Sequence, residues 1–175
     1  VCSSDLFCFS EQGTGKTASA IWAADYLMKQ GLVQRVLVIC PLSIMRSAWQ
    51  ADLFKFAVHR SCDVAHGNRE ARLDVVRSNA EFVIVNYDGV EIIVDEIISD
   101  GRFDLIIVDE ASGYKNVQTR RWKTLKKLLS IDVRIWMMTG TPAAQSPLDA
   151  YGLAKIVNPV ATPKFFGQRS EEHTS

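Results

Sequence analysis

The residues best suited to chemistry lie in two short polar segments, and the first of them precedes a helix-forming stretch. Residues 10–17 read SEQGTGKT. Gly13 and Gly15 allow the backbone to curl so that its N–H groups converge on phosphate oxygens. The following helix adds the positive end of its dipole. We expect Lys16 to reach the β- and γ-phosphates of a nucleotide and the Thr17 hydroxyl to bind Mg²⁺.

The segment departs from the strict phosphate-loop pattern at one position. Ser10 stands where G-x-x-x-x-G-K-[ST] requires its first glycine. Taken alone, the segment is also compatible with an ordinary turn followed by a helix cap. Its position between an apolar strand and a helix favours the phosphate loop, with Gly13, Thr14, Gly15, Lys16 and Thr17 as the nucleotide-binding residues.

The second polar segment, Asp-Glu-Ala-Ser at 109–112, follows the apolar run Leu105 to Val108. Strands often end in an acidic residue simply because the chain returns to solvent. In open α/β sheets, however, ligands bind at the carboxyl ends of the strands, and a phosphate loop on an adjacent strand makes a site more plausible. We expect Asp109 to hold Mg²⁺, usually through water, and Glu110 to orient the attacking water. Together the two segments predict hydrolysis of a Mg²⁺-bound nucleotide, with Lys16, Asp109 and Glu110 as catalytic residues.

A third apolar run ends in Thr-Gly-Thr-Pro at 139–142. Gly and Pro alone would explain this segment as a turn. The acidic pair is expected at the same sheet edge. The hydroxyls of Thr139 and Thr141 are therefore candidates for hydrogen bonds to the carboxylates, through which they would signal the state of the acidic pair.

These segments require a scaffold of alternating strands and helices. The expected strands are 7–9, 35–40, 62–66, 82–86, 104–108 and 133–139, and the expected helices are about 16–30, 43–57, 68–78, 88–99, 116–129 and 147–157. Several strand runs are continuously apolar, which is typical of strands covered on both faces in a parallel sheet. The pattern predicts a single α/β domain with three layers and a mainly parallel central sheet.

Composition narrows the class of protein further. The 175 residues include 20 basic and 20 acidic side chains, for a formal net charge of zero. This neutral balance argues against binding to DNA or anionic lipid through bulk charge alone, so any nucleic-acid contact must be local. No apolar run approaches the length of about 20 residues that a membrane span needs. We expect a cytoplasmic protein with no membrane partner.

The two ends of the chain look foreign to the domain. Residues 169–175, RSEEHTS, are a translation of a common sequencing-library adapter, and residues 1–6, VCSSDL, translate its reverse complement. Matches in opposite orientation at opposite ends predict that both segments are artefacts, to be set aside when the fold is considered. The genuine domain is then residues 7–168, truncated at both ends.

The order of the motifs resembles that of the Swi/Snf-type ATPases of helicase superfamily two. The sequence of residues 11–17 is more similar to bacterial and phage members than to eukaryotic ones. The resemblance covers nearly all of residues 7–168. Its matching segments are 11–17 (motif I), 41–43 with 49–52 (Ia), 83–87 (Ib), 109–112 with Lys115-Asn116 (II), and 139–142 (III). Departures are Ser112 in place of a common histidine, Gln145 in place of Asn, and Asn86 in place of Thr.

The resemblance implies the first of two RecA-like lobes, with ATP between the lobes and duplex DNA across both. It implies contacts to the DNA backbone near Ser43, Asn86 and Tyr87, which position a protein without reading sequence. It also implies ATP-driven translocation along DNA in a bacterial or phage-infected cell. The second lobe, which supplies an arginine finger, is absent from these residues, so they alone are expected to hydrolyse ATP barely.

Two other functions remain open. One is an RNA or single-strand helicase of the same superfamily. The segments Thr139 to Pro142 and Lys115-Asn116 favour the DNA branch over this alternative. The other is a nucleotide-binding switch module without motor activity. Among the aromatic residues, Trp49 is expected to pack a helix on the sheet rather than to stack on a base.

Overall fold

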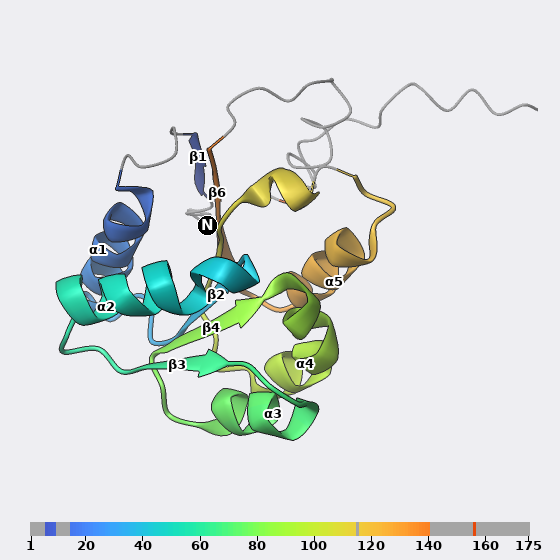
Figure 1. Ribbon diagram of the computed structural model, residues 1–175, viewed down its shortest axis with the longest axis horizontal. Helices are drawn as coiled ribbons and strands as arrows, with labels where there is room; N and C mark the ends of the chain where they lie inside the picture. Colours follow the sequence, from blue (N-terminus) through green and yellow to red (C-terminus); the bar gives the residue numbers. More distant parts are fainter. Residues whose placement is uncertain (1–5, 10–14, 115, 141–155, 157–175) are drawn as a thin grey trace, which may run out of the picture.

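The computed structural model describes residues 6–9, 15–114, 116–140 and 156. Within them, six strands form one sheet in the order β1-β6-β5-β2-β4-β3, and every neighbouring pair is parallel (Figure 1). The strands are β1 (Leu6–Phe9), β2 (Val36–Cys40), β3 (Cys62–Ala65), β4 (Phe82–Asn86), β5 (Leu105–Val108) and β6 (Arg134–Thr139). The predicted α/β class with a parallel central sheet is confirmed.

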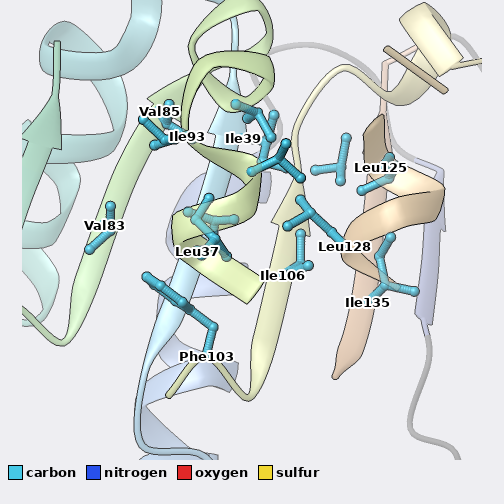
Figure 2. Packing of buried hydrophobic residues seen from close by; sticks show 14 of the residues in the cluster. Leu37, Ile39, Val83, Val85, Ile93, Phe103, Ile106, Leu125, Leu128 and Ile135 are labelled. Atoms are coloured by element: carbon cyan, nitrogen blue, oxygen red, sulfur yellow. The ribbon is translucent and has the colours of Figure 1, made fainter. Parts of the chain in front are cut away.

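Helices cover both faces of this sheet. The helices are α1 (Lys16–Lys29), α2 (Ala51–Phe56), α3 (Arg69–Arg77), α4 (Tyr87–Asp100) and α5 (Arg120–Leu128). Successive strand residues point to opposite faces, so a continuously apolar strand serves two cores. In β2, Leu37 and Ile39 pack in the core with α3, α4 and α5, whereas Val36 and Val38 pack in the core with α1 and α2. Figure 2 shows the first of these cores, where Ile93 of α4 lies close to the sheet.

Two predicted helices differ from those observed. The expected helix 43–57 is divided into η1 (Leu42–Ile44), the π-helix η2 (Met45–Gln50) and α2. The expected helix 116–129 begins only at Arg120, because Asn116 and Thr119 use their side chains to bond nearby backbone N–H groups. Such local bonds cap a helix and compete with its interior. The expected helix 147–157 lies outside the described residues except for Ile156, which is helical and buried.

Because all six strands are parallel, their carboxyl ends share one edge of the sheet. That edge carries Pro41 after β2, Asn86 at the end of β4, Asp109 after β5 and Thr139 at the end of β6. The expectation that the phosphate-loop strand lies adjacent to the acidic strand is wrong, since β6 separates β1 from β5. A sheet edge brings such segments together whether or not their strands are immediate neighbours.

No helix in the described ranges combines the length and the apolar character needed to cross a membrane.

Helix α1 carries a buried carboxylate that forms several ion pairs. Asp25 of α1 is 7% exposed and pairs with Lys29 (2.7 Å), His59 (2.8 Å) and Arg60 (2.8 Å). Arg60 also pairs with Glu81, just before β4, at 2.8 Å. Burial by itself raises the pKa of Asp25, but the hydrogen bonds from Lys29, Arg60 and His59 outweigh burial and bring the pKa well below its usual range.

We predict that Asp25→Asn destabilises the domain at neutral pH and that its deficit shrinks in acid. A carboxyl whose pKa is depressed by folding adds stability above its unfolded pKa of about 4, and this stability is lost as the pH falls below that value. Urea unfolding of both proteins from pH 7 to pH 3 measures the effect, with exposed Asp74→Asn as the control. A deficit that stays constant over this range would show that the ion pairs of Asp25 add no pH-dependent stability.

Candidate functional site

A cavity of about 630 Å³ opens at the carboxyl edge of the sheet. It is lined by residues from the start of α1, the segment after β2, α2 and the segment after β5: Gly15, Lys16, Thr17, Pro41, Ser43, Ile44, Asp52, Asp109 and Glu110. The cavity therefore unites residues from the two polar segments that the sequence singles out, although 93 positions separate Lys16 from Asp109.

The start of α1 lies at the cavity. Gly15 caps the helix with φ 77°, a left-handed conformation that favours glycine. Lys16 and Thr17 occupy the first turn and line the cavity. With no acidic side chain in that turn, the helix dipole presents a positive end to the cavity. Gly13 and Thr14 lie outside the described residues.

Asp109 is a buried carboxylate held by hydrogen bonds from two sides. Its Oδ2 accepts from the Trp49 indole Nε1–H at 2.9 Å, and its Oδ1 accepts from the Glu110 N–H at 2.9 Å. Burial raises the pKa of Asp109 above its usual value, while the hydrogen bonds from Trp49 and Glu110 and the charge of Lys16 act against this rise. A second cation on the cavity side would favour the ionised carboxylate in the same way.

Glu110 adopts a left-handed backbone conformation, with φ 54°. A non-glycine residue in this region costs of order 1–3 kcal/mol and tends to occur at functional sites. The Ser112 hydroxyl donates to Glu110 Oε1 at 2.9 Å, and the Thr139 hydroxyl lies 3.5 Å from the same oxygen. Both contacts hold the half-buried carboxylate at the cavity wall. Thr141, the other predicted coupling residue, lies outside the described residues.

The three predicted nucleic-acid residues are placed differently from one another. Ser43 is exposed and lines the cavity. Asn86 is 9% exposed, and its Oδ1 accepts from Arg72 Nη1 at 3.1 Å. Gly89 leaves room for this pair, because a Cβ at that position would lie 2.2 Å from Arg72 Nη1. The Tyr87 hydroxyl donates to the backbone oxygen of Asp109. Contacts of all three residues with DNA remain predictions.

Sequence reasoning missed two residues that shape the site. The expectation that Trp49 packs in the core is correct, since the side chain is fully buried among residues of the α1 and α2 face. Its indole N–H, however, also holds Asp109. A buried tryptophan N–H usually needs an acceptor, and this need is the one signal that the sequence contained. Ser112 was noted only as a departure from a family pattern, whereas its hydroxyl contacts Glu110.

The oxygen atoms that line the cavity suit a metal ion whose remaining ligands are water molecules and substrate oxygens. In the described part of the chain, no group of three or more His, Cys, Asp or Glu side chains gathers to hold an ion. Mg²⁺ binds proteins through one or two carboxylates together with waters and phosphate oxygens. The hard oxygens of Thr17 and Asp109 fit that chemistry, and a lysine beside them fits a phosphate.

The sequence as a whole matches a known family. A family model for the SNF2-related domain covers residues 3–171. The chain belongs to the SNF2-related domain family. Among its curated relatives, a "SWI/SNF-related matrix-associated actin-dependent regulator of chromatin subfamily A-like protein 1" of Xenopus laevis is 30% identical over 168 residues, which is 94% of this chain and 16% of the relative. An "Uncharacterized ATP-dependent helicase" of Mycoplasma genitalium is 29% identical, over 92% of this chain and 15% of the relative.

Solved structures agree with this assignment. The Sulfolobus solfataricus SWI2/SNF2 ATPase core in complex with dsDNA matches with a TM-score of 0.75 and 25% identity, over 89% of this chain and 32% of that one. The SNF2 chain thus has the RecA-like fold of an SNF2 ATPase core domain. It spans about a sixth of the curated relatives' length.

Proposed function

We propose that this SNF2 domain is the ATP-binding lobe of a DNA-dependent ATPase that hydrolyses Mg²⁺-bound ATP and uses it to move along duplex DNA. The observation that supports this function best is the single cavity into which Gly15, Lys16 and Thr17 project together with Asp109 and Glu110. Support for duplex DNA comes from the similar Sulfolobus solfataricus ATPase core, whose structure contains dsDNA.

Each residue of the cavity has a role in this proposal. Backbone N–H groups from Gly13 to Thr17 bind the phosphates, and Lys16 contacts the β- and γ-phosphates. Thr17 and Asp109 would hold Mg²⁺, which, when bound, neutralises charge on the phosphate oxygens. Glu110 orients a water and accepts its proton.

Residues around the cavity complete the proposed machinery. Thr139 and Thr141 couple to the state of Glu110. The Thr139 hydroxyl oxygen lies 3.5 Å from Glu110 Oε1. Ser43, Asn86 and Tyr87 lie at the ends of β2 and β4, where the DNA backbone would cross the lobe. Such contacts would be independent of base sequence.

The lobe is expected to need a second RecA-like lobe for turnover. An arginine finger of the type that a second lobe supplies raises the rate by about 10³–10⁵. We predict that residues 7–168 alone bind nucleotide weakly and hydrolyse it barely, whereas a protein that joins them to a second lobe is an ATPase stimulated by duplex DNA. The test is to measure the steady-state rate of phosphate release by both proteins, with and without duplex DNA.

Phosphate release, together with a measurement of ATP binding, separates the alternatives. Stimulation by RNA or single strands in preference to duplex would indicate a helicase of another branch. Tight ATP binding with no stimulation by any nucleic acid would indicate a switch module. Robust duplex-stimulated turnover by residues 7–168 alone would contradict the need for a second lobe.

The adapter origin of residues 1–6 and 169–175, and a bacterial or phage source, remain proposals as well. β1 begins at Leu6, the last residue of the first of these segments. Reading the gene across both junctions tests both ideas, and natural codons that continue the present frame would contradict the adapter origin.

A further inference from the structure

Tyr87 reaches from the end of β4 to the acidic turn that follows β5. It is the first residue of α4 (Figure 1), and its hydroxyl donates to the backbone oxygen of Asp109 and lies 3.2 Å from that of Glu110. A backbone carbonyl oxygen can only accept, so the Tyr87 hydroxyl is the donor in this contact. The side chain therefore contacts the backbone at both residues of the acidic pair.

The turn that Tyr87 contacts is the one with a strained backbone. Glu110 has φ 54°, and the same residue lines the cavity. A left-handed non-glycine residue persists when surrounding contacts hold it in place. The Tyr87 hydroxyl supplies such a contact from the start of α4, at a separation of 22 to 23 residues.

The ring of Tyr87 is itself held on other sides. Tyr114 packs edge-on against it, with centroids 5.7 Å apart and an interplanar angle of 72°. The Arg121 guanidinium lies 4.9 Å from the ring centroid and also pairs with Asp88 at 3.1 Å. A tyrosine fixed by a neighbouring ring and a cation has little freedom to turn its hydroxyl away from the acidic turn.

We propose that Tyr87 is a positioning residue for Glu110, whose backbone it holds in the conformation that presents the carboxylate to the cavity. This inference rests on the proposed function of Glu110 as the residue that orients water. It assigns the Tyr87 hydroxyl to the ATPase site, so the DNA contact proposed for this residue would come from its other atoms.

The test is Tyr87→Phe in the protein that joins this lobe to a second lobe. The variant keeps the ring and its packing but removes the hydroxyl. Misplacing a reacting group by about 1 Å can lower a rate up to about 100-fold. We expect kcat at saturating duplex to fall about tenfold, a loss of about 1.4 kcal/mol in transition-state stabilisation. KM for ATP and the affinity for duplex are expected to stay within about twofold, as is usual when an interaction acts only in the transition state.

Tyr114→Phe is the matched control, because it removes a buried hydroxyl from the same aromatic pair. Within the described part of the chain, Tyr114 makes no hydrogen bond to Asp109 or Glu110. Thermal unfolding of each variant shows whether the protein is folded at the assay temperature, so that kcat refers to folded protein. A purely structural role would lower the melting temperature and leave kcat unchanged.

The outcomes are distinct. A fall in kcat for Tyr87→Phe alone supports the proposal. A weaker affinity for duplex with unchanged kcat overturns it in favour of a DNA contact, and unchanged kcat and affinity overturn it outright. If Glu110→Gln also leaves turnover intact, the proposed function of Glu110 fails and not merely the role of Tyr87.

Discussion

Glutamine in place of Glu110 is expected to lower steady-state ATP turnover by about 10²–10⁴-fold, the range that a positioned general base contributes. Glu110 lines the cavity that Lys16 and Thr17 share, and its Oε1 accepts the Ser112 hydroxyl. Glutamine has the same shape, and its carbonyl oxygen still accepts from Ser112. The substitution therefore removes the negative charge and the proton acceptor while leaving the local structure in place.

Binding of nucleotide should survive this substitution. In the proposed function, the phosphate loop and Asp109 make the phosphate and Mg²⁺ contacts, whereas Glu110 is proposed to act on the water. We expect Glu110→Gln to bind Mg²⁺-bound ATP with an affinity within about threefold of the original protein and to retain it without hydrolysis, because the lost interaction belongs to the transition state.

The measurement combines single-turnover hydrolysis with binding of a fluorescent ATP analogue, in the protein that carries both lobes. Glu91→Gln is the control, since Glu91 is an exposed carboxylate on α4 that pairs with Arg120. Loss of nucleotide affinity in parallel with the rate would mean that Glu110 acts on the bound nucleotide itself. Unimpaired hydrolysis would remove Glu110 from the mechanism.

The sequence was sufficient for the parts of the site that depend on short segments. The turn at Gly15 and the carboxylates after β5 each follow from a few consecutive residues. Parallel pairing then brings the strand ends to one edge, and continuously apolar runs such as Val36 to Cys40 made the parallel sheet predictable. Local chemistry and one topological rule were enough to place Lys16, Thr17, Asp109 and Glu110 at one cavity.

Contacts between distant segments were not predictable in the same way. Trp49 and Asp109 are 60 residues apart, and Trp49 lies in a π-helix that periodicity alone does not reveal. The left-handed backbone of Glu110 depends on the surrounding contacts, because nothing in the residue type favours it. The inward orientation of Asn86 requires Arg72 on another element and a glycine at 89. Each of these features is set by tertiary packing.

The bond from Trp49 to Asp109 leads to the second large expected effect, a loss of Mg²⁺ affinity in Trp49→Phe. Trp49 is fully buried, and its indole N–H lies 2.9 Å from Oδ2 of the carboxylate proposed to hold the metal. Outer partners that orient a metal-binding carboxylate are typically worth about 10–100-fold in metal affinity. Phenylalanine fills part of the space but donates no hydrogen bond.

Charge strengthens this expectation. Burial raises the pKa of Asp109, and the Trp49 hydrogen bond opposes that rise. Removing the donor therefore favours the protonated carboxyl, which is a poor ligand for a hard cation. The loss of orientation and the loss of ionisation act in the same direction, and neither affects the phosphate contacts proposed for Lys16.

The experiment compares nucleotide affinity with and without Mg²⁺, because the predicted defect lies in the difference between the two. In Trp49→Phe we expect the Mg²⁺-dependent gain in affinity to fall by about 10–100-fold and the metal-free affinity to stay the same. Trp136→Phe, in the same core cluster, controls for the lost volume. Lys16→Ala gives the contrasting pattern, with both affinities reduced. Equal losses with and without Mg²⁺ in Trp49→Phe would mean that the indole supports only the shape of the cavity, and that Asp109 holds its orientation without it.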